Sequence, residues 1–81
     1  MIKIYTMTNC KHCEEAKNIL KDHNLQFEEC DLKLKENREI RQQWRDLGAT
    51  SVPVIVSDNW KLLHYKKDEL IKLVENERKE N

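Results

Sequence analysis

Hydrophobic and polar positions form short blocks that predict strands alternating with helices in the first half of the chain. Residues 2–6 and 25–32 are rich in β-branched, aromatic and other apolar residues, in runs short enough for strands. Apolar residues recur at helical spacing over 11–23 and again over 36–47, and Gly48 stands in the usual position just past a helix end. A helix between two strands implies a right-handed crossover, so the first two strands should be parallel.

The next part of the chain predicts a β-hairpin. The stretch 50–56 contains Pro53 and then an apolar third strand. The polar residues 57–59 form a tight turn, and residues 60–65 form a fourth strand that pairs antiparallel to the third.

The C-terminal part predicts a last helix that starts at or is capped by Asp68. Leu70, Ile71 and Val74 share one face of this helix, and residues 75–81 are a polar tail expected to fray. The element order is therefore β-α-β-α-β-β-α. This order predicts an α/β fold in one domain spanning residues 1–81, because a chain of this length has room for one small core.

The segment 36–47 has an apolar stripe and a charged surface. Trp44 lies on the apolar stripe, four residues from Ile40, and is expected in the core. The charged positions are expected to face water, and a docking surface is the less favoured alternative. These positions are Arg38, Glu39, Arg41, Arg45 and Asp46.

Cys10 and Cys13 lie between the first strand and the first helix. A disulfide needs Cβ atoms about 3.8 Å apart, whereas residues three apart in a regular helix have Cβ atoms about 5–6 Å apart. Cys10 must therefore lie at the helix edge, with Asn9 as a candidate N-cap. Free backbone N–H groups and the helix dipole favour a thiolate there. This predicts Cys10 as a redox nucleophile and Cys13, one turn deeper, as the resolving thiol.

The two residues between the cysteines are expected to modulate this site. Lys11 and a protonated His12 add positive charge beside the sulfur of Cys10. Glu14 and Glu15 are expected in the first turn of the helix, where they temper that charge.

Metal binding is the main alternative use of the cysteine pair. A structural zinc site needs a second close ligand pair, and Cys30, His23 and His64 are isolated from one another. Met7 with the two thiolates would suit Cu(I), although the element order fits a copper chaperone poorly. No metal site is predicted, and Cys30 is expected to be a small buried hydrophobe rather than a regulatory or metal-binding thiol.

Composition narrows the remaining classes of function. Fifteen basic and fifteen acidic residues cancel and are interleaved, so charge gives no case for binding nucleic acid or an anionic membrane. No apolar run approaches the roughly 18 residues of a membrane span, and the N-terminus reads as a strand rather than a signal peptide. Three cysteines are too few for a disulfide framework. We expect a cytoplasmic, monomeric protein.

The cysteine motif, the segment Ser51-Val52-Pro53 and the element order together resemble the glutaredoxin-like branch of the thioredoxin superfamily, including NrdH-type redoxins. The resemblance spans nearly the whole chain and implies a thioredoxin-like fold, with a four-stranded mixed sheet flanked by three helices. It also implies thiol-disulfide oxidoreductase activity, with Cys10 attacking and Cys13 resolving. Val52 and Pro53, joined by a cis bond, would pack beside the disulfide and offer backbone groups to the substrate.

The resemblance also implies partners. Substrates would be protein disulfides, with ribonucleotide reductase as one candidate, and no cofactor would be tightly bound. Met7 stands where glutaredoxins commonly carry a glutathione-binding Lys, and Leu63-His64 where they carry Gly-Gly. Both a thioredoxin reductase and glutathione as co-substrate therefore stay open as electron donors. A metal or iron–sulfur binding module and a redox-sensing interaction domain are the rival functions.

Overall fold

The computed structural model describes residues 1–79, apart from the side chains of Lys35, Arg78 and Lys79. Four strands form one sheet in the order β2-β1-β3-β4. β1 is parallel to β2 and antiparallel to β3, and β3 is antiparallel to β4, so the predicted mixed sheet is confirmed. The strands are β1 (Ile2–Thr6), β2 (Phe27–Asp31), β3 (Val54–Val56) and β4 (Lys61–Leu62).

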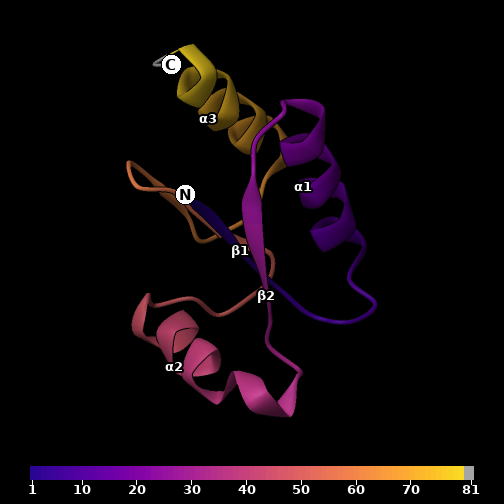
Figure 1. Cartoon of the computed structure of the whole chain (residues 1–81), viewed down its shortest axis with the longest axis vertical. Helices are drawn as coiled ribbons and strands as arrows, with labels where there is room; N and C mark the ends of the chain where they lie inside the picture. Colours follow the sequence, from indigo (N-terminus) through magenta and orange to yellow (C-terminus); the bar gives the residue numbers. More distant parts are fainter. Residues whose placement is uncertain (80–81) are drawn as a thin grey trace.

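Helices lie on both faces of this sheet (Figure 1). α1 (Lys11–Asp22) and α3 (Lys67–Lys79) pack beside each other on one face. The 3₁₀ turn η1 (Lys35–Asn37) and α2 (Arg38–Asp46) lie on the other face, at the end of the molecule opposite α3.

Each face of the sheet has its own apolar cluster, because side chains alternate between faces along a strand. The cluster under α1 and α3 consists of Ile2, Ile4, Ala16, Ile19, Leu20, Ile55, Leu62, Leu70 and Val74. The cluster on the α2 side consists of Tyr5, Cys30, Leu32, Ala49 and Val54. β2 contributes to both clusters, since Phe27 packs on the first and Cys30 lies in the second.

The single helix predicted over 36–47 is divided in two. Asn37 has φ −97° and ψ 34°, outside the helical region, and its Nδ2 donates to the carbonyl of Asp31 at 2.7 Å. This contact ties η1 to the end of β2, and the regular helix α2 begins only at the next residue, Arg38. Gly48 has φ 84° just past α2, as predicted, because a left-handed residue there favours glycine.

Trp44 is less buried than the prediction of a core residue requires. Trp44 is half-buried against the second cluster, and no residue of α2 is fully buried. Its indole Nε1 donates to the carbonyl of Ser51 at 3.1 Å, so the ring lies at the edge where its N–H reaches a polar partner.

The prediction of a frayed tail from residue 75 is also wrong for its described part. α3 starts at Lys67, one residue before Asp68, and continues to Lys79. Within its last turns, the Glu77 carboxylate accepts hydrogen bonds from Ser57 Oγ and from Trp60 Nε1. These contacts hold α3 against the β3–β4 turn. Residues 80–81 of the predicted tail lie outside the described residues.

The predicted fourth strand is much shorter than expected, because only Lys61–Leu62 pair with β3. The backbone leaves the sheet after Leu62, so Tyr65 is free to turn towards α1. In the described part of the chain, no helix has the length and apolar character needed to cross a membrane.

Candidate active site

Cys10 and Cys13 are joined by a disulfide at the junction between β1 and α1. Their Cα atoms are 5.2 Å apart, a separation typical of disulfide-bonded pairs. Cys10 has φ −108° and ψ 108°, which is extended backbone, and α1 begins at the next residue. The predicted position of Cys10 at the helix edge is confirmed.

Cys10 itself is the N-cap of α1, so the prediction of Asn9 as the cap is wrong. The Sγ atom of Cys10 accepts a hydrogen bond from the backbone N–H of Cys13 at 3.1 Å. Asn9 instead has φ 60°, a left-handed conformation that asparagine tolerates better than most residues. This turn at Asn9 brings the sulfur of Cys10, rather than the amide of Asn9, to the free N–H groups of the helix.

The two sulfurs differ in their access to solvent. Cys10 is half-buried, whereas Cys13 is 1% exposed and packs inside the first turn of α1. An external disulfide can therefore approach Cys10 but not Cys13.

Lys11 and His12 are both exposed at the start of α1. The two nearby acids that were expected to temper their charge have other partners. Glu14 forms an ion pair with Lys17 at 2.9 Å, and this hydrogen bond is the main cause of the raised pKa of Lys17. Glu15 accepts a hydrogen bond from the Tyr65 hydroxyl at 2.6 Å.

Tyr65 is a neighbour of the site that the sequence did not predict. Its ring lies 5.7 Å from the ring of His12, centroid to centroid, with the planes tilted by 49°. Burial, and then the hydrogen bond to Glu15, raise the pKa of the Tyr65 hydroxyl, which therefore stays protonated and donates. The only available signal was an aromatic residue in the segment after the fourth strand, and nothing local connected it to His12.

The Val52–Pro53 peptide bond is cis, as the resemblance implied. Pro53 is buried and directly precedes β3, and Tyr5 pairs with Val54. Continuing this register places Pro53 beside Thr6, the last residue of β1. The Val52–Pro53 segment and the loop of residues 7–10, here called the cysteine loop, therefore adjoin neighbouring strands at the same end of the sheet.

The third cysteine lies apart from this pair. Cys30 is a free thiol in β2, is 2% exposed and pairs in register with Tyr5. Burial, and secondarily the negative charge of Glu28, raise its pKa and keep it in the neutral thiol form. The prediction of a small buried hydrophobe is confirmed. Among the described residues, no group of three or more His, Cys, Asp or Glu side chains is arranged to hold a metal ion.

Comparison with known proteins agrees with this geometry. The family model for glutaredoxin matches residues 2–59, which include the cysteine pair, the cis-proline segment and β3. The chain belongs to the glutaredoxin family.

Relatives within and near this glutaredoxin family cover almost the whole chain. A glutaredoxin-like 8.6 kDa protein in the rubredoxin operon of Clostridium pasteurianum is 36% identical over 76 residues, which are 93% of this chain and 99% of that protein. The glutaredoxin-like protein NrdH of Lactococcus lactis subsp. lactis is 29% identical over 73 residues, 90% of this chain and 99% of that protein. In fold, the chain is similar to the NrdH-redoxin of Escherichia coli, with a TM-score of 0.75 and 22% identity, covering 89% of this chain and 92% of that one.

These findings assign the general activity. A glutaredoxin and NrdH-like redoxin with a Cys10–Cys13 disulfide at the start of α1 is a small thiol-disulfide oxidoreductase with a thioredoxin-like fold. Glutaredoxins act on disulfides with electrons from a reductant partner, and glutathione is one reductant available to the family.

Proposed function

We propose that Cys10 is the nucleophile and Cys13 the resolving thiol in the reduction of protein disulfides. The observation that carries this proposal is the hydrogen bond from the Cys13 N–H to the Sγ of the half-buried Cys10. In the reduced protein, the same N–H and the start of α1 stabilise a thiolate on Cys10.

The reaction proceeds in two exchange steps. The Cys10 thiolate attacks one sulfur of the substrate disulfide, the substrate S–S bond breaks, and the departing sulfur takes up a proton. Cys13 then loses its proton and attacks Sγ of Cys10 in the mixed disulfide, which releases the second substrate thiol. The substrate gains two electrons, and the protein is left with the Cys10–Cys13 disulfide.

The other predicted residues have supporting roles in this proposal. Val52 and Pro53 offer backbone groups to the bound substrate, because their segment leaves the sheet next to the end of β1. Lys11, and His12 in its protonated form, add positive charge that favours the Cys10 thiolate, and so the reduced form of the protein. A cytoplasmic location suits a dithiol that must be reduced again after each cycle.

The reductant is either a thioredoxin reductase or glutathione, and ribonucleotide reductase is a candidate substrate. Insulin reduction, run in parallel with thioredoxin reductase plus NADPH and with glutathione plus glutathione reductase, identifies the electron source. Turnover by the first route alone would group this protein functionally with NrdH-type redoxins. Turnover by the second alone would make it a glutathione-dependent enzyme.

Substitution of each cysteine tests the assigned roles. We expect Cys10→Ser to abolish turnover, because serine cannot attack a disulfide. Cys13→Ser should still attack once and accumulate as a mixed disulfide, which intact-protein mass spectrometry detects. Cys30→Ala should turn over like the wild type, because Cys30 is buried on β2. Residual turnover by Cys10→Ser, or a mixed disulfide on Cys13, would contradict the assignment.

A further inference from the structure

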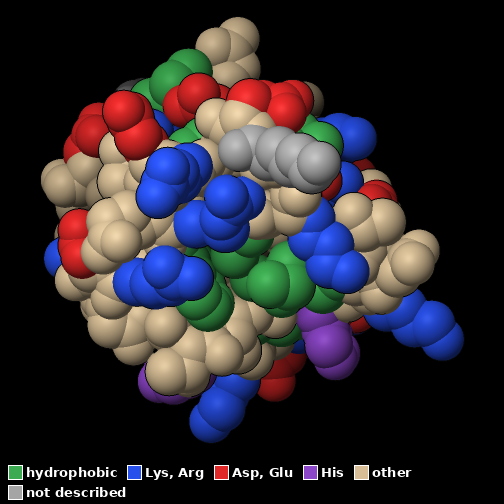
Figure 2. All heavy atoms as spheres, turned by 90° about the horizontal axis from the view of Figure 1, so that it is seen from below, with side chains coloured by type: hydrophobic (Ala, Val, Ile, Leu, Met, Phe, Trp, Pro, Cys, Tyr) green, Lys and Arg blue, Asp and Glu red, His purple; other side chains and the backbone are tan. Residues whose placement is uncertain are grey.

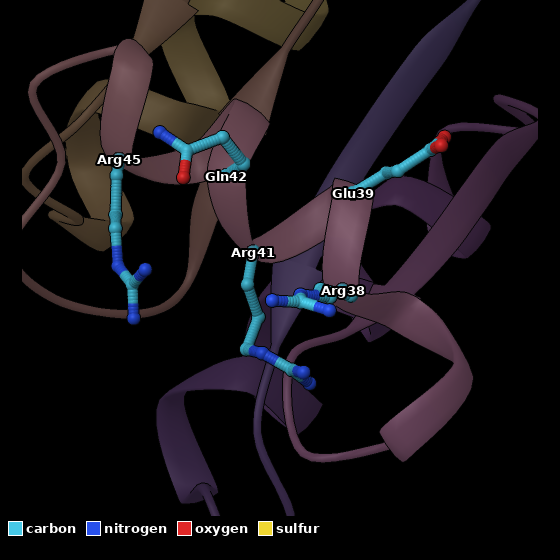
Figure 3. A pocket seen from close by; sticks show the side chains of 5 residues that line it. All are labelled: Arg38, Glu39, Arg41, Gln42 and Arg45. Carbon is cyan, nitrogen blue, oxygen red and sulfur yellow. The ribbon is translucent and has the colours of Figure 1, made fainter.

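Three arginines form a stripe along one face of α2. Arg38, Arg41 and Arg45 are spaced at i, i+3 and i+7, which puts them on one side of a helix. With Gln42 and Glu39 they line a surface hollow of about 500 Å³. In Figure 3 the three guanidinium groups lie on the same side of the helix, and the carboxylate of Glu39 points away from them.

The positive charge of this arginine stripe is not neutralised by any acidic side chain that the structure describes. Arg38, Arg41 and Arg45 form no ion pair with a described residue. Asp46 instead accepts a hydrogen bond from Gln42. Arg41 donates to the carbonyls of Leu32 and Leu34, which orients its guanidinium without cancelling its charge.

The stripe lies on an element that is tied to both sides of the active site. Arg41 holds α2 to the chain that follows β2, where the Leu32 N–H donates to the carbonyl of Thr6 at the end of β1. Trp44 holds α2 to Ser51, just before the Val52–Pro53 segment. The stripe and the cysteine loop therefore belong to the same end of the molecule, the lower end in Figure 1.

Exposed apolar side chains occur at this end as well. Met7, which follows β1, is 36% exposed, and Leu34, whose carbonyl accepts from Arg41, is 46% exposed. Figure 2 looks at this end and shows Lys and Arg side chains around hydrophobic ones near the middle, with most of the visible Asp and Glu side chains towards the margin. A small anion would use only the cations, whereas a protein segment can use both kinds of contact.

We propose that the arginine stripe, with Met7 and Leu34, docks an acidic segment of the protein whose disulfide is reduced at Cys10. This proposal rests on the proposed function and deepens it by naming the substrate class. Guanidinium groups bind carboxylates in paired hydrogen bonds. Arg38 and Arg45 are about 10 Å apart along the helix axis, and alternate side chains of an extended peptide repeat at about 7 Å, so one segment reaches both.

Two synthetic peptides provide the test. Each contains one intramolecular disulfide and a leucine, and they differ only in flanking aspartates or asparagines. Reduced protein is mixed with each peptide in a single-turnover experiment, which needs no reductase. We expect the aspartate peptide to react about threefold to tenfold faster than the asparagine peptide, the range for two exposed charge pairs, and added salt to remove the difference.

Two double variants test whether the preference for the aspartate peptide depends on the arginine stripe. Arg38→Gln with Arg45→Gln should bring the ratio of the two rates close to one. Lys61→Gln with Lys72→Gln removes the same charge from exposed positions on β4 and α3 and should leave the ratio unchanged. Equal loss of the ratio in both double variants would mean a general charge effect and would overturn the proposal, as would equal wild-type rates for the two peptides.

Reduction of oxidised glutathione tests whether the arginine stripe binds small carboxylates instead of a protein segment. If the arginine variant slows the reduction of oxidised glutathione as much as that of the aspartate peptide, the stripe binds small carboxylates and the proposed protein segment is wrong. A labelled aspartate peptide with serines in place of its cysteines measures binding to the oxidised protein by fluorescence anisotropy. This readout tests the arginine stripe even if Cys10→Ser retains turnover and the proposed function fails.

Discussion

At the scale of single residues, the hydroxyl of Tyr65 connects segments that are 50 residues apart. It donates to Glu15 on α1 while its ring contacts His12, so the loop after β4 is fixed beside the active site. Tyr5 offers a contrast. The residue is 4% exposed, but none of the hydrogen bonds among the described residues involves its hydroxyl.

Tyr65→Phe should therefore destabilise the protein, whereas Tyr5→Phe should have little effect. The Tyr65 substitution loses a hydrogen bond to a carboxylate and keeps the ring, so we expect the free energy of unfolding to fall by about 1 kcal/mol. Tyr5→Phe should stay within about 0.5 kcal/mol of the wild type. Urea unfolding at neutral pH measures both, and equal losses would show that the Glu15 contact contributes nothing.

The sequence predicted Asn9 as the N-cap of α1, whereas the structure has the sulfur of Cys10 in that role. The cysteine spacing and the start of the helix were predictable, because both depend on residues close together in the chain. The cap was not, because asparagine is a preferred N-cap residue and cysteine is not, so residue type favours Asn9 over Cys10. The left-handed φ of Asn9 decides between them, and that angle depends on how the loop leaves β1.

At the scale of elements, the end of α3 is fixed by contacts outside the helix. Glu77 accepts from Ser57, which is 7% exposed, and from Trp60 Nε1 at 2.6 Å. These bonds join the last turns of α3 to both sides of the short turn between β3 and β4. They explain why the helix continues through a stretch whose polar sequence predicted fraying.

Glu77→Ala should weaken this junction. Two bonds to a carboxylate are lost and a largely buried hydroxyl keeps no such acceptor, so we expect the free energy of unfolding to fall by about 2 kcal/mol. Glu75→Ala, an exposed position on the same helix, is the matched control and should change it by less than about 0.5 kcal/mol. Urea unfolding of both variants makes the comparison, and similar losses at the two positions would mean that only helix propensity is involved.

The elements that the sequence predicted well are those with local signals. β1, α1 and the hairpin follow from periodicity, a turn and their neighbours, and the resemblance supplied the cis Val52–Pro53 bond. The failures involve distant partners, such as Trp60 for Glu77 and His12 for Tyr65. The spacing of the arginines on α2 was visible in the sequence. That no described acidic side chain pairs with them depends on where Asp46 and Glu39 point.

At the scale of the whole molecule, burial makes three described side chains resist losing their protons. Burial is the largest cause of the raised pKa of Tyr5, Cys30 and Tyr65. In each case the folded protein holds the proton more tightly than the unfolded chain does. The stability that results is fully present below the unfolded pKa values, 9.0 for the thiol and 10.0 for the phenols, and is lost as pH rises through the folded values.

We therefore expect stability to decline on the alkaline side. Urea midpoints measured from neutral pH upward should stay level and then fall above about pH 9. Cys30→Ala should reduce the first part of this fall and Tyr65→Phe the later part, because each removes one of the titrating groups. A midpoint that rises with pH in this range, or identical slopes in both variants and the wild type, would contradict the linkage.

The unequal burial of the three thiols makes the reduced protein easy to label at one place. Cys10 is half-buried, whereas Cys13 is 1% and Cys30 is 2% exposed, so an alkylating reagent meets only the first sulfur while the fold is intact. A brief treatment would attach a fluorophore or a crosslinker at the same end of the molecule as the arginine stripe, without any engineered cysteine. The chain thus carries its own attachment point for capturing whatever docks at that end.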